Sequence, residues 1–310
     1  MKISACIHAV IFSAILTACG GGSRTTAMRR PYAPPAAPAA ISDEAARTRY
    51  VAEHYWDLFD FADTALWSDR KYIMESFAPY FQGLATLGSE YAVPALQRLL
   101  HLAAADSAAG ANVREICDLC LDDPNSPMRN EELYIILLRE LLADPSLSPA
   151  EKIAPGHRLR MLLRNRPGEV AADFAYIDTE GRRGTLHTTA APGLLLFFHN
   201  PGCAACAELI QHLEQSEAIC EAITSGRLKV LALYPDSDTC AWAACRDELP
   251  DGWINARDPD MSITRDTLYD LRAIPTLYLL DSRKRVVVKD AADTAPIERS
   301  LAQTTNNTTL

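Results

Sequence analysis

The chain contains the stretch LLLFFHNPGCAACAELIQHL at residues 194–213, and this stretch decides the expected fold. An apolar run at residues 194–198 is typical of a buried strand, and residues 207–213 read as a helix. The motif Cys203-Ala204-Ala205-Cys206 therefore falls where a strand ends and a helix begins. The first sulfur then lies near unpaired N–H groups and the positive end of the helix dipole, which favour the thiolate. A thiolate attacks disulfides and a second cysteine at this spacing resolves the mixed disulfide, so the motif predicts redox chemistry.

The start of the chain indicates where this chemistry takes place. Lys2 and a short apolar core at residues 6–16 predict a signal peptide, residues 1–18. The core ends in Leu16-Thr17-Ala18-Cys19, which resembles the lipobox of bacterial lipoproteins; an ordinary signal peptide cut at a nearby small residue is the alternative. The resemblance implies lipidation of Cys19 and a periplasm-facing anchor in the bacterial cell envelope. Gly20, with no acidic residue close behind Cys19, favours the outer membrane by similarity to known sorting signals.

Composition excludes some partners and limits the number of domains. The formal net charge of −10 makes nucleic acid an unsuitable partner, and 48% hydrophobic with 23% charged residues is typical of a globular protein. A length of 310 residues suggests about two domains. After the signal peptide, no apolar run is long enough to cross a membrane. Residues 19–41, rich in glycine, proline and alanine, predict a semi-extended tether.

Residues 42–165 show helical periodicity throughout, which predicts an all-helical domain. Asn130 precedes two acidic residues and is expected to cap a helix. Nothing in this part is arranged like a catalytic site. Helices are expected from Ser42 onward and over residues 72–84, 90–105, 111–121, 131–142 and 149–164.

A second pair, Cys117-Asp118-Leu119-Cys120, falls on one face near the end of a helical stretch. Packed thiols, a local disulfide and a redox or metal role are all compatible with this position. A four-cysteine zinc site with Cys203 and Cys206 would need the two domains docked together. The sequence therefore leaves the role of this pair open.

The remaining part, residues 166–310, changes to short strand-like runs that alternate with helical ones. Asp178-Thr179-Glu180-Gly181 reads as a hairpin turn. This pattern predicts a mixed α/β domain with a central sheet flanked by helices. Strands are expected over residues 171–177, 186–188, 194–198, 228–234, 253–256, 276–280 and 286–288.

The cysteine motif after a strand, together with Ala273-Ile274-Pro275-Thr276 before another apolar run, resembles the thioredoxin family. The resemblance implies that Pro275 is cis, stands against the two sulfurs, and that Ile274 offers its backbone to a substrate chain. An ordinary turn proline is the alternative. The lipid anchor and the extra hairpin resemble the envelope-tethered thioredoxins that include cytochrome-maturation reductases. The stretch at residues 123–132 looks like the uncharacterised helical domain often joined to such lipoproteins.

The chain departs from the thioredoxin pattern in three places. Gly202 replaces the usual tryptophan, Ala204-Ala205 replaces the usual spacer, and Phe197 stands where a buried aspartate is expected. Deprotonation of Cys206 then depends on water, His199 or Glu208. His199 at a strand end is alternatively just solvated, and Glu208 is alternatively a surface residue.

Nine cysteines impose one further constraint. Removal of Cys6 with the signal peptide and acylation of Cys19 leave seven, so at least one thiol has no partner within the chain. Cys220 is expected to be packed, and Cys240 and Cys245 to form a local structural disulfide in an oxidising compartment.

These observations predict a membrane-tethered thiol-disulfide oxidoreductase of the reductase or isomerase type, acting on protein thiols and disulfides of the envelope. Cys203 attacks, Cys206 resolves, and neither a metal nor a cofactor beyond the cysteine pair is expected. One alternative is a redox-inactive binding module whose helical domain docks an envelope partner. A peroxidase is disfavoured because the motif Pro-x-x-x-Thr-x-x-Cys is absent before Cys203.

Overall fold

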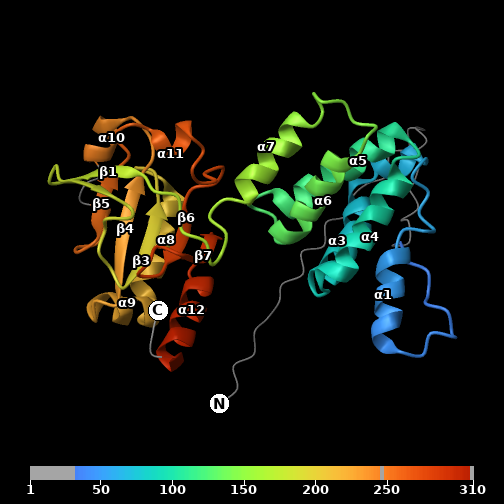
Figure 1. Cartoon of the computed structure of the whole chain (residues 1–310), viewed down its shortest axis with the longest axis horizontal. Helices are drawn as coiled ribbons and strands as arrows, with labels where there is room; N and C mark the ends of the chain where they lie inside the picture. The colour runs from blue at the N-terminus through green and yellow to red at the C-terminus, as the bar shows by residue number, and fades with distance from the viewer. Residues whose placement is uncertain (1–31, 245–247, 308–310) are drawn as a thin grey trace, which may run out of the picture.

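The computed structural model describes residues 32–244 and 248–307, with side chains up to residue 303. Figure 1 shows an all-helical part followed by a sheet flanked by helices, joined by the segment after α7. The predicted fold class, an all-α domain followed by an α/β thioredoxin-like domain, is confirmed.

The first part is built from short helices, most of which have an acidic or amide N-cap. Asn130 accepts a hydrogen bond from the backbone N–H of Leu133 at 3.1 Å, so the predicted cap is confirmed. Such a cap satisfies one of the N–H groups that a helix start leaves unpaired. The helices are α1 (Glu44–His54), α2 (Thr64–Ser68), α3 (Arg70–Ala85), α4 (Ser89–Ala103), α5 (Ser107–Cys117), η1 (Asp118–Asp122), α6 (Glu131–Ala143) and α7 (Ile153–Leu162).

An aromatic cluster forms the core of this part. Trp56 packs on Phe77 with ring centroids 4.2 Å apart, and both side chains are buried. Tyr32 stacks on Trp56 at 5.4 Å and donates a hydrogen bond to the carbonyl of Tyr55. Tyr32 belongs to the segment predicted as tether, so the described end of that segment is packed on the helices.

Two helical predictions need correction. The short helix α2 was not predicted, because its five residues are too few to show a helical period. The helix expected over residues 111–121 is two elements, since α5 ends at Cys117 and one π-helical turn, η1, follows.

A seven-stranded mixed sheet forms the second part. The strand order is β2-β1-β5-β4-β3-β6-β7, with β3, β4 and β5 parallel and the other pairs antiparallel. The strands are β1 (Ala175–Asp178), β2 (Arg183–Thr185), β3 (Gly193–Phe198), β4 (Leu228–Tyr234), β5 (Ile254–Arg257), β6 (Thr276–Leu280) and β7 (Val286–Ala291).

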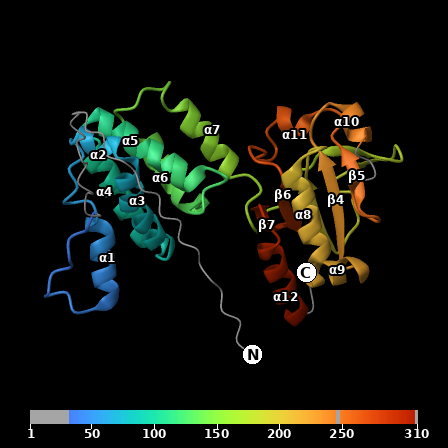
Figure 2. The same ribbon diagram turned by 180° about the vertical axis from the view of Figure 1, so that it is seen from behind.

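Both faces of the central strand β3 are covered, and all six of its residues are buried. Leu195 and Phe197 pack against α8 (Ala204–Gln215), α9 (Glu217–Thr224) and α12 (Ala295–Asn307). Leu196 and Phe198 point to the core on the other face of the sheet, and α11 (Ser262–Arg265) helps to cover that core (Figure 2). The remaining helix, α10 (Thr239–Ala244), follows β4. This two-sided burial explains why β3 reads as a continuous apolar run and not as an alternating one.

The strand predictions are correct for the central sheet and wrong at its edge. Residues 228–234 and 276–280 are strands with the predicted bounds. Residues 186–188 are not a strand; the strand is β2, and Leu186 lies fully buried in the turn behind it. Leu186 is apolar because it packs into the core from the turn and not because it belongs to a strand. The predicted hairpin between β1 and β2 is confirmed, with Gly181 at a φ of +79°.

Within the described residues, no helix is both long and apolar enough to cross a membrane.

Candidate active site

The cysteine motif lies at the junction of β3 and α8, as the sequence predicts. Gly202 takes a φ of +67°, a conformation that suits glycine, and Cys203 is the N-cap of α8. The Cys203 sulfur accepts a hydrogen bond from the backbone N–H of Cys206 at 3.2 Å. An N–H donor and the helix dipole both stabilise negative charge on this sulfur, and Cys203 is partly exposed. Cys203 therefore lies partly exposed at the start of a helix, with a backbone N–H directed at its sulfur.

The second cysteine has the opposite environment. The side chain of Cys206 is 3% exposed, and both cysteines of the motif are free thiols in the structure. Burial, together with the neighbouring Cys203 sulfur, raises the pKa of Cys206 to about 12. Cys206 therefore keeps its proton near neutral pH, whereas Cys203 faces solvent.

Pro275 lies beside this junction because of the sheet register. β3 and β6 are antiparallel, with Phe198 paired to Thr276, so the segment before Thr276 meets the segment after Phe198. The Ile274–Pro275 peptide bond is cis, which confirms the expectation from the family resemblance. Ile274 packs on the same core cluster as Cys203. Within the described residues, neither the N–H nor the carbonyl of Ile274 has a hydrogen-bond partner.

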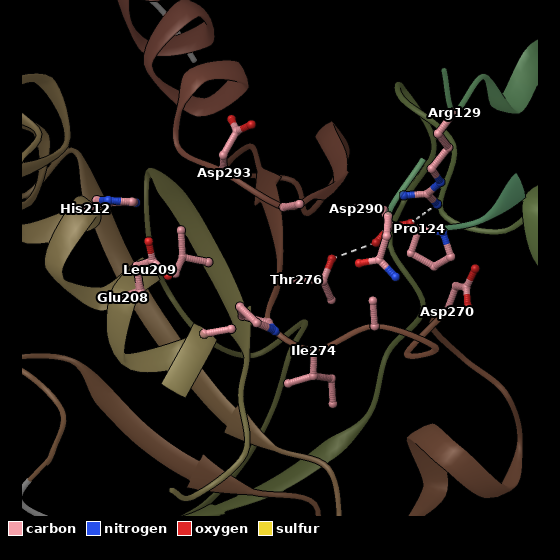
Figure 3. Close-up of a pocket in the computed structure, with 15 residues that line it drawn as sticks. Pro124, Arg129, Glu208, Leu209, His212, Asp270, Ile274, Thr276, Asp290 and Asp293 are labelled. Carbon is pink, nitrogen blue, oxygen red and sulfur yellow. Dashed lines mark hydrogen bonds and ion pairs between the residues drawn. The ribbon is translucent and has the colours of Figure 1, made fainter. Parts of the chain in front are cut away.

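Two cavities border the motif and separate the two predicted proton acceptors. One, of about 470 Å³, is lined by Cys203, Cys206 and His199. The other, of about 370 Å³, is lined by Pro275 and by Glu208, which is exposed on α8 (Figure 3). Of the two predicted candidates, only His199 thus shares a cavity with the Cys206 thiol.

His199 is not the solvated strand-end residue that the sequence allowed. Its side chain is 5% exposed and stacks on Phe197, with ring centroids 5.4 Å apart. Burial lowers the pKa of His199 to about 4, so the ring is neutral at neutral pH. Its Nε2 atom is buried and has no hydrogen-bond partner within the described part of the chain. With a phenyl ring at position 197, the cavity of the cysteines contains the neutral His199 imidazole together with the carboxyl groups of Glu214 and Glu248.

Comparisons with known proteins agree with this geometry. A crystal structure of a thioredoxin-like protein from Bacteroides caccae ATCC 43185 matches with 37% identity and a TM-score of 0.80, over 89% of this chain and 99% of that one. The chain belongs to the thioredoxin-like proteins. The family model described as a domain of unknown function, DUF5106, matches residues 16–165, which include the helical part.

Other solved structures match less than half of the chain. The C-terminal domain of an uncharacterized protein from Bacteroides fragilis NCTC 9343 is 44% identical over 44% of this chain and 98% of that one, with a TM-score of 0.43. A domain of a possible thiol-disulfide isomerase from Cytophaga hutchinsonii ATCC 33406 is 24% identical over 47% and 97%, with a TM-score of 0.38. No curated protein matched the chain.

The other cysteines of this thioredoxin-like protein are placed as follows. Cys117 and Cys120 are buried free thiols in the structure, which agrees with the packed-thiol interpretation. The described residues contain no metal-binding cluster of histidine, cysteine or acidic side chains. Cys240 is exposed and Cys245 lies outside the described residues, so their pairing stays a prediction. Cys19 also lies outside the described residues, and its lipidation stays a prediction. Cys220 is only partly buried and contacts the Glu214 carbonyl.

Sequence reasoning missed the contribution of the helical part to this site. Arg129 forms an ion pair with Asp290, and Thr276 Oγ1 donates a hydrogen bond to the same carboxylate at 2.7 Å (Figure 3). Arg129 and Asp290 are 161 positions apart in the chain. No local pattern marks such a contact, because it depends on how the two parts dock.

Proposed function

We propose that this thioredoxin-like protein is a membrane-tethered thiol-disulfide oxidoreductase that acts on envelope proteins as a reductase or isomerase. The supporting observation is the asymmetry of the cysteine pair beside Pro275. Cys203 caps a helix and is partly exposed, whereas Cys206 is 3% exposed and its pKa is raised. A nucleophile that meets substrate and a proton-holding thiol behind it are the two roles that disulfide exchange needs.

In the first step, the Cys203 thiolate attacks one sulfur of a substrate disulfide. A bond forms between Cys203 and that sulfur, the substrate disulfide breaks, and its second sulfur leaves as a thiolate that takes a proton from water. The unpaired N–H and carbonyl of Ile274 are available to pair with the extended substrate backbone. This pairing holds the substrate sulfur beside Cys203.

In the second step, Cys206 loses its proton and attacks the Cys203 sulfur. The Cys203–Cys206 disulfide forms, and the first substrate sulfur leaves as a thiolate. The substrate gains two electrons and two protons, and a thiol donor of the envelope must then reduce the pair. In isomerisation the substrate's own second thiol replaces Cys206, and no net electrons are transferred.

His199 is the proton acceptor that we propose for Cys206. It lines the same cavity and offers an unpaired, neutral ring nitrogen. Its low pKa means that it passes the proton on to solvent instead of keeping it. Glu208 has weaker support in this role, because it lines the cavity of Pro275.

The uncharged spacer favours the reductase or isomerase direction. Ala204 and Ala205 add no cation near the Cys203 sulfur, so the thiolate lacks the extra stabilisation that makes a strong oxidant. The proposed anchor is the lipid on Cys19, with the bacterial outer membrane as its site. The substrates are then disulfide-containing proteins within reach of that anchor.

A redox titration of the chain from residue 20 onward tests the proposal. Alkylation and mass spectrometry report the Cys203 and Cys206 thiols at each potential. We expect a reduction potential near or below about −230 mV, whereas about −120 mV would indicate an oxidant. If the pair never interconverts between dithiol and disulfide, the binding-module alternative is the better account.

A trapping experiment tests the order of the two cysteines. The Cys206→Ser variant should accumulate mixed disulfides with envelope proteins, because Cys203 still attacks and nothing resolves the adduct. The matched Cys203→Ser variant should accumulate none. Equal adducts on both variants would contradict the assignment of Cys203 as the nucleophile.

A further inference from the structure

The helical part is connected to the Pro275 loop by a cluster of ion pairs, in which Arg272 is exposed and the other three side chains are mostly buried. Arg158 on α7 donates to Asp122 at 2.6 Å and to Asp270 at 2.7 Å. Arg272 donates to the same two carboxylates, at 2.8 Å to Asp122 and 3.1 Å to Asp270. Asp122 and Asp270 side chains are about one-tenth exposed, so water screens these contacts weakly. Two residues just before Pro275 are therefore fixed to the helices.

A second connection lies directly after the proline. Thr276 donates to Asp290 on β7, and Asp290 is paired with Arg129, which lies in the loop at residues 123–130 between η1 and α6 (Figure 3). The helical part thus contacts the segment before Pro275 directly, and the residue after it through Asp290. The position of this loop relative to Pro275 is set by the fold and not by a flexible linker.

The loop also forms one wall of the cavity beside Pro275. The cavity of about 370 Å³ is lined by this loop, by α8, by the segment around the proline and by residues 290–293 at the end of β7. Figure 3 shows Pro124 and Arg129 across the cavity from Glu208 and His212. Ile274 and Pro275 line this cavity, so a chain that pairs with the Ile274 backbone lies along it.

The charges of this cavity are unequally compensated. The carboxylates of Asp270 and Asp290 are paired with arginines. Glu208 and Asp293 are exposed, and within the described residues neither has a cationic partner. Asp293 accepts only the backbone N–H of Ala295, at 2.9 Å. Among the described residues, Glu208 on α8 and Asp293 between β7 and α12 therefore give this cavity two negative charges without a cationic partner.

We propose that loop 123–130 of the helical part is a specificity-determining wall of the substrate groove, and that the groove takes an extended polypeptide with lysine or arginine close to its disulfide. This inference rests on the proposed disulfide exchange at Cys203. The Ile274 backbone provides strand-like pairing, which selects a polypeptide. Glu208 and Asp293 attract the cationic side chain of the substrate, and loop 123–130 limits the size of the substrate side chains on the opposite side of the groove.

Two synthetic peptides test the charge preference on the chain from residue 20 onward. They carry the same disulfide, flanked by lysines in one and by glutamates in the other. We expect the lysine peptide to react about tenfold faster at low salt, with the ratio falling towards one in high salt. The double variant Glu208→Gln/Asp293→Asn should also bring the ratio close to one.

A bulky substitution tests the wall. Asn125 is exposed and lines the cavity, and its backbone N–H bond to Asp123 does not need its own side chain. Asn125→Trp should slow the lysine peptide by about tenfold or more. Gln82→Trp, at an exposed position on α3, is the matched control and should leave the rate unchanged.

A small uncharged disulfide, 2-hydroxyethyl disulfide, separates this inference from the proposed function. It should oxidise Cys203 and Cys206 at the same rate in the wild type and in the Asn125→Trp and Gln82→Trp variants. If it reacts but the two peptides react equally in the wild type, or Asn125→Trp has no effect, the groove inference is overturned and disulfide exchange stands. If the pair reacts with none of the three disulfides, the proposed function fails as well.

Discussion

The chain contains two Cys-x-x-Cys motifs, and their different surroundings show what makes such a motif reactive. Cys117 lies at the end of α5 with Cys120 in the next turn, and both side chains are completely buried. Cys203 caps the start of α8 and is partly exposed. Burial raises the pKa of Cys120 to about 11, and that of Cys117 well above its usual range. The spacing is identical, so position relative to the helix and to solvent decides the chemistry.

The largest expected effect separates the two motifs by activity. Cys203→Ser should reduce the rate of disulfide reduction in a test protein on the order of a thousandfold, because it removes the nucleophile. Cys117→Ser, as the matched control, should retain the wild-type rate per folded molecule. Comparable losses in both variants would show that the buried pair takes part in exchange.

A second difference between the motifs is that the buried His199 lies next to Cys203 and Cys206. This histidine predicts that the free energy of unfolding depends on pH. The pKa of His199 is lowered by burial to about 4 in the folded state, from about 6.5 in the unfolded chain. The unfolded state therefore binds the proton first, and stability is lost as pH falls from about 6.5 to about 4. The loss amounts to about 3 kcal/mol in the free energy of unfolding.

Denaturant unfolding at several pH values checks this prediction. His199→Phe keeps an aromatic ring on Phe197 and should flatten the profile between pH 6.5 and 4. His212→Gln, at an exposed histidine of α8, should keep the wild-type profile. An unchanged profile in His199→Phe would assign the acid sensitivity to other groups.

The two motifs are also connected through ion pairs. The helical turn that contains Cys120 ends at Asp122. Asp122 and Asp270, which lies near Pro275, both pair with Arg158 and with Arg272. Burial would raise the pKa of Asp270, but hydrogen bonds and charge from Arg272 and Arg158 lower it to about 2. This lowering contributes about 2 kcal/mol of stability that is present above about pH 4 and is lost as pH falls through about 2.

Asp270→Asn should therefore unfold more easily at pH 7 by about 2 kcal/mol, and the difference from the wild type should shrink towards pH 2. Asp266→Asn, at an exposed carboxylate paired with Arg265, should show no measurable change. A pH-independent difference for Asp270→Asn would point to packing instead of charge.

The smallest expected effect concerns the packing of the first motif. Cys117→Ser places a hydroxyl in an apolar core and should cost about 1 to 2 kcal/mol of stability, measured by denaturant unfolding. Cys203→Ser should cost less, because serine is itself a good N-cap. Equal costs would contradict the view that one motif is structural and the other is chemical.

The sequence by itself determined the two-part architecture, the central strands, the Asn130 cap and the redox motif at a helix start. These depend on local periodicity, capping and turn chemistry, which neighbouring residues specify. Residues 186–188 were assigned to a strand incorrectly, because Leu186 is buried by a turn and not by a strand. A local sequence pattern indicates that a residue is buried, but it does not indicate whether the residue lies in a strand or in a turn.

Only the tertiary structure decided what surrounds the cysteines. The burial of Cys206 and His199, the packing of Cys117 and Cys120, and the contacts of Arg129 and Arg158 with the Pro275 loop depend on docking of distant segments. Asp122 and Arg272 are 150 positions apart, yet they share one ion pair. Local sequence patterns place the two cysteines at the start of a helix. Long-range packing sets their solvent access, their electrostatic neighbours and the walls of the cavities beside the motif.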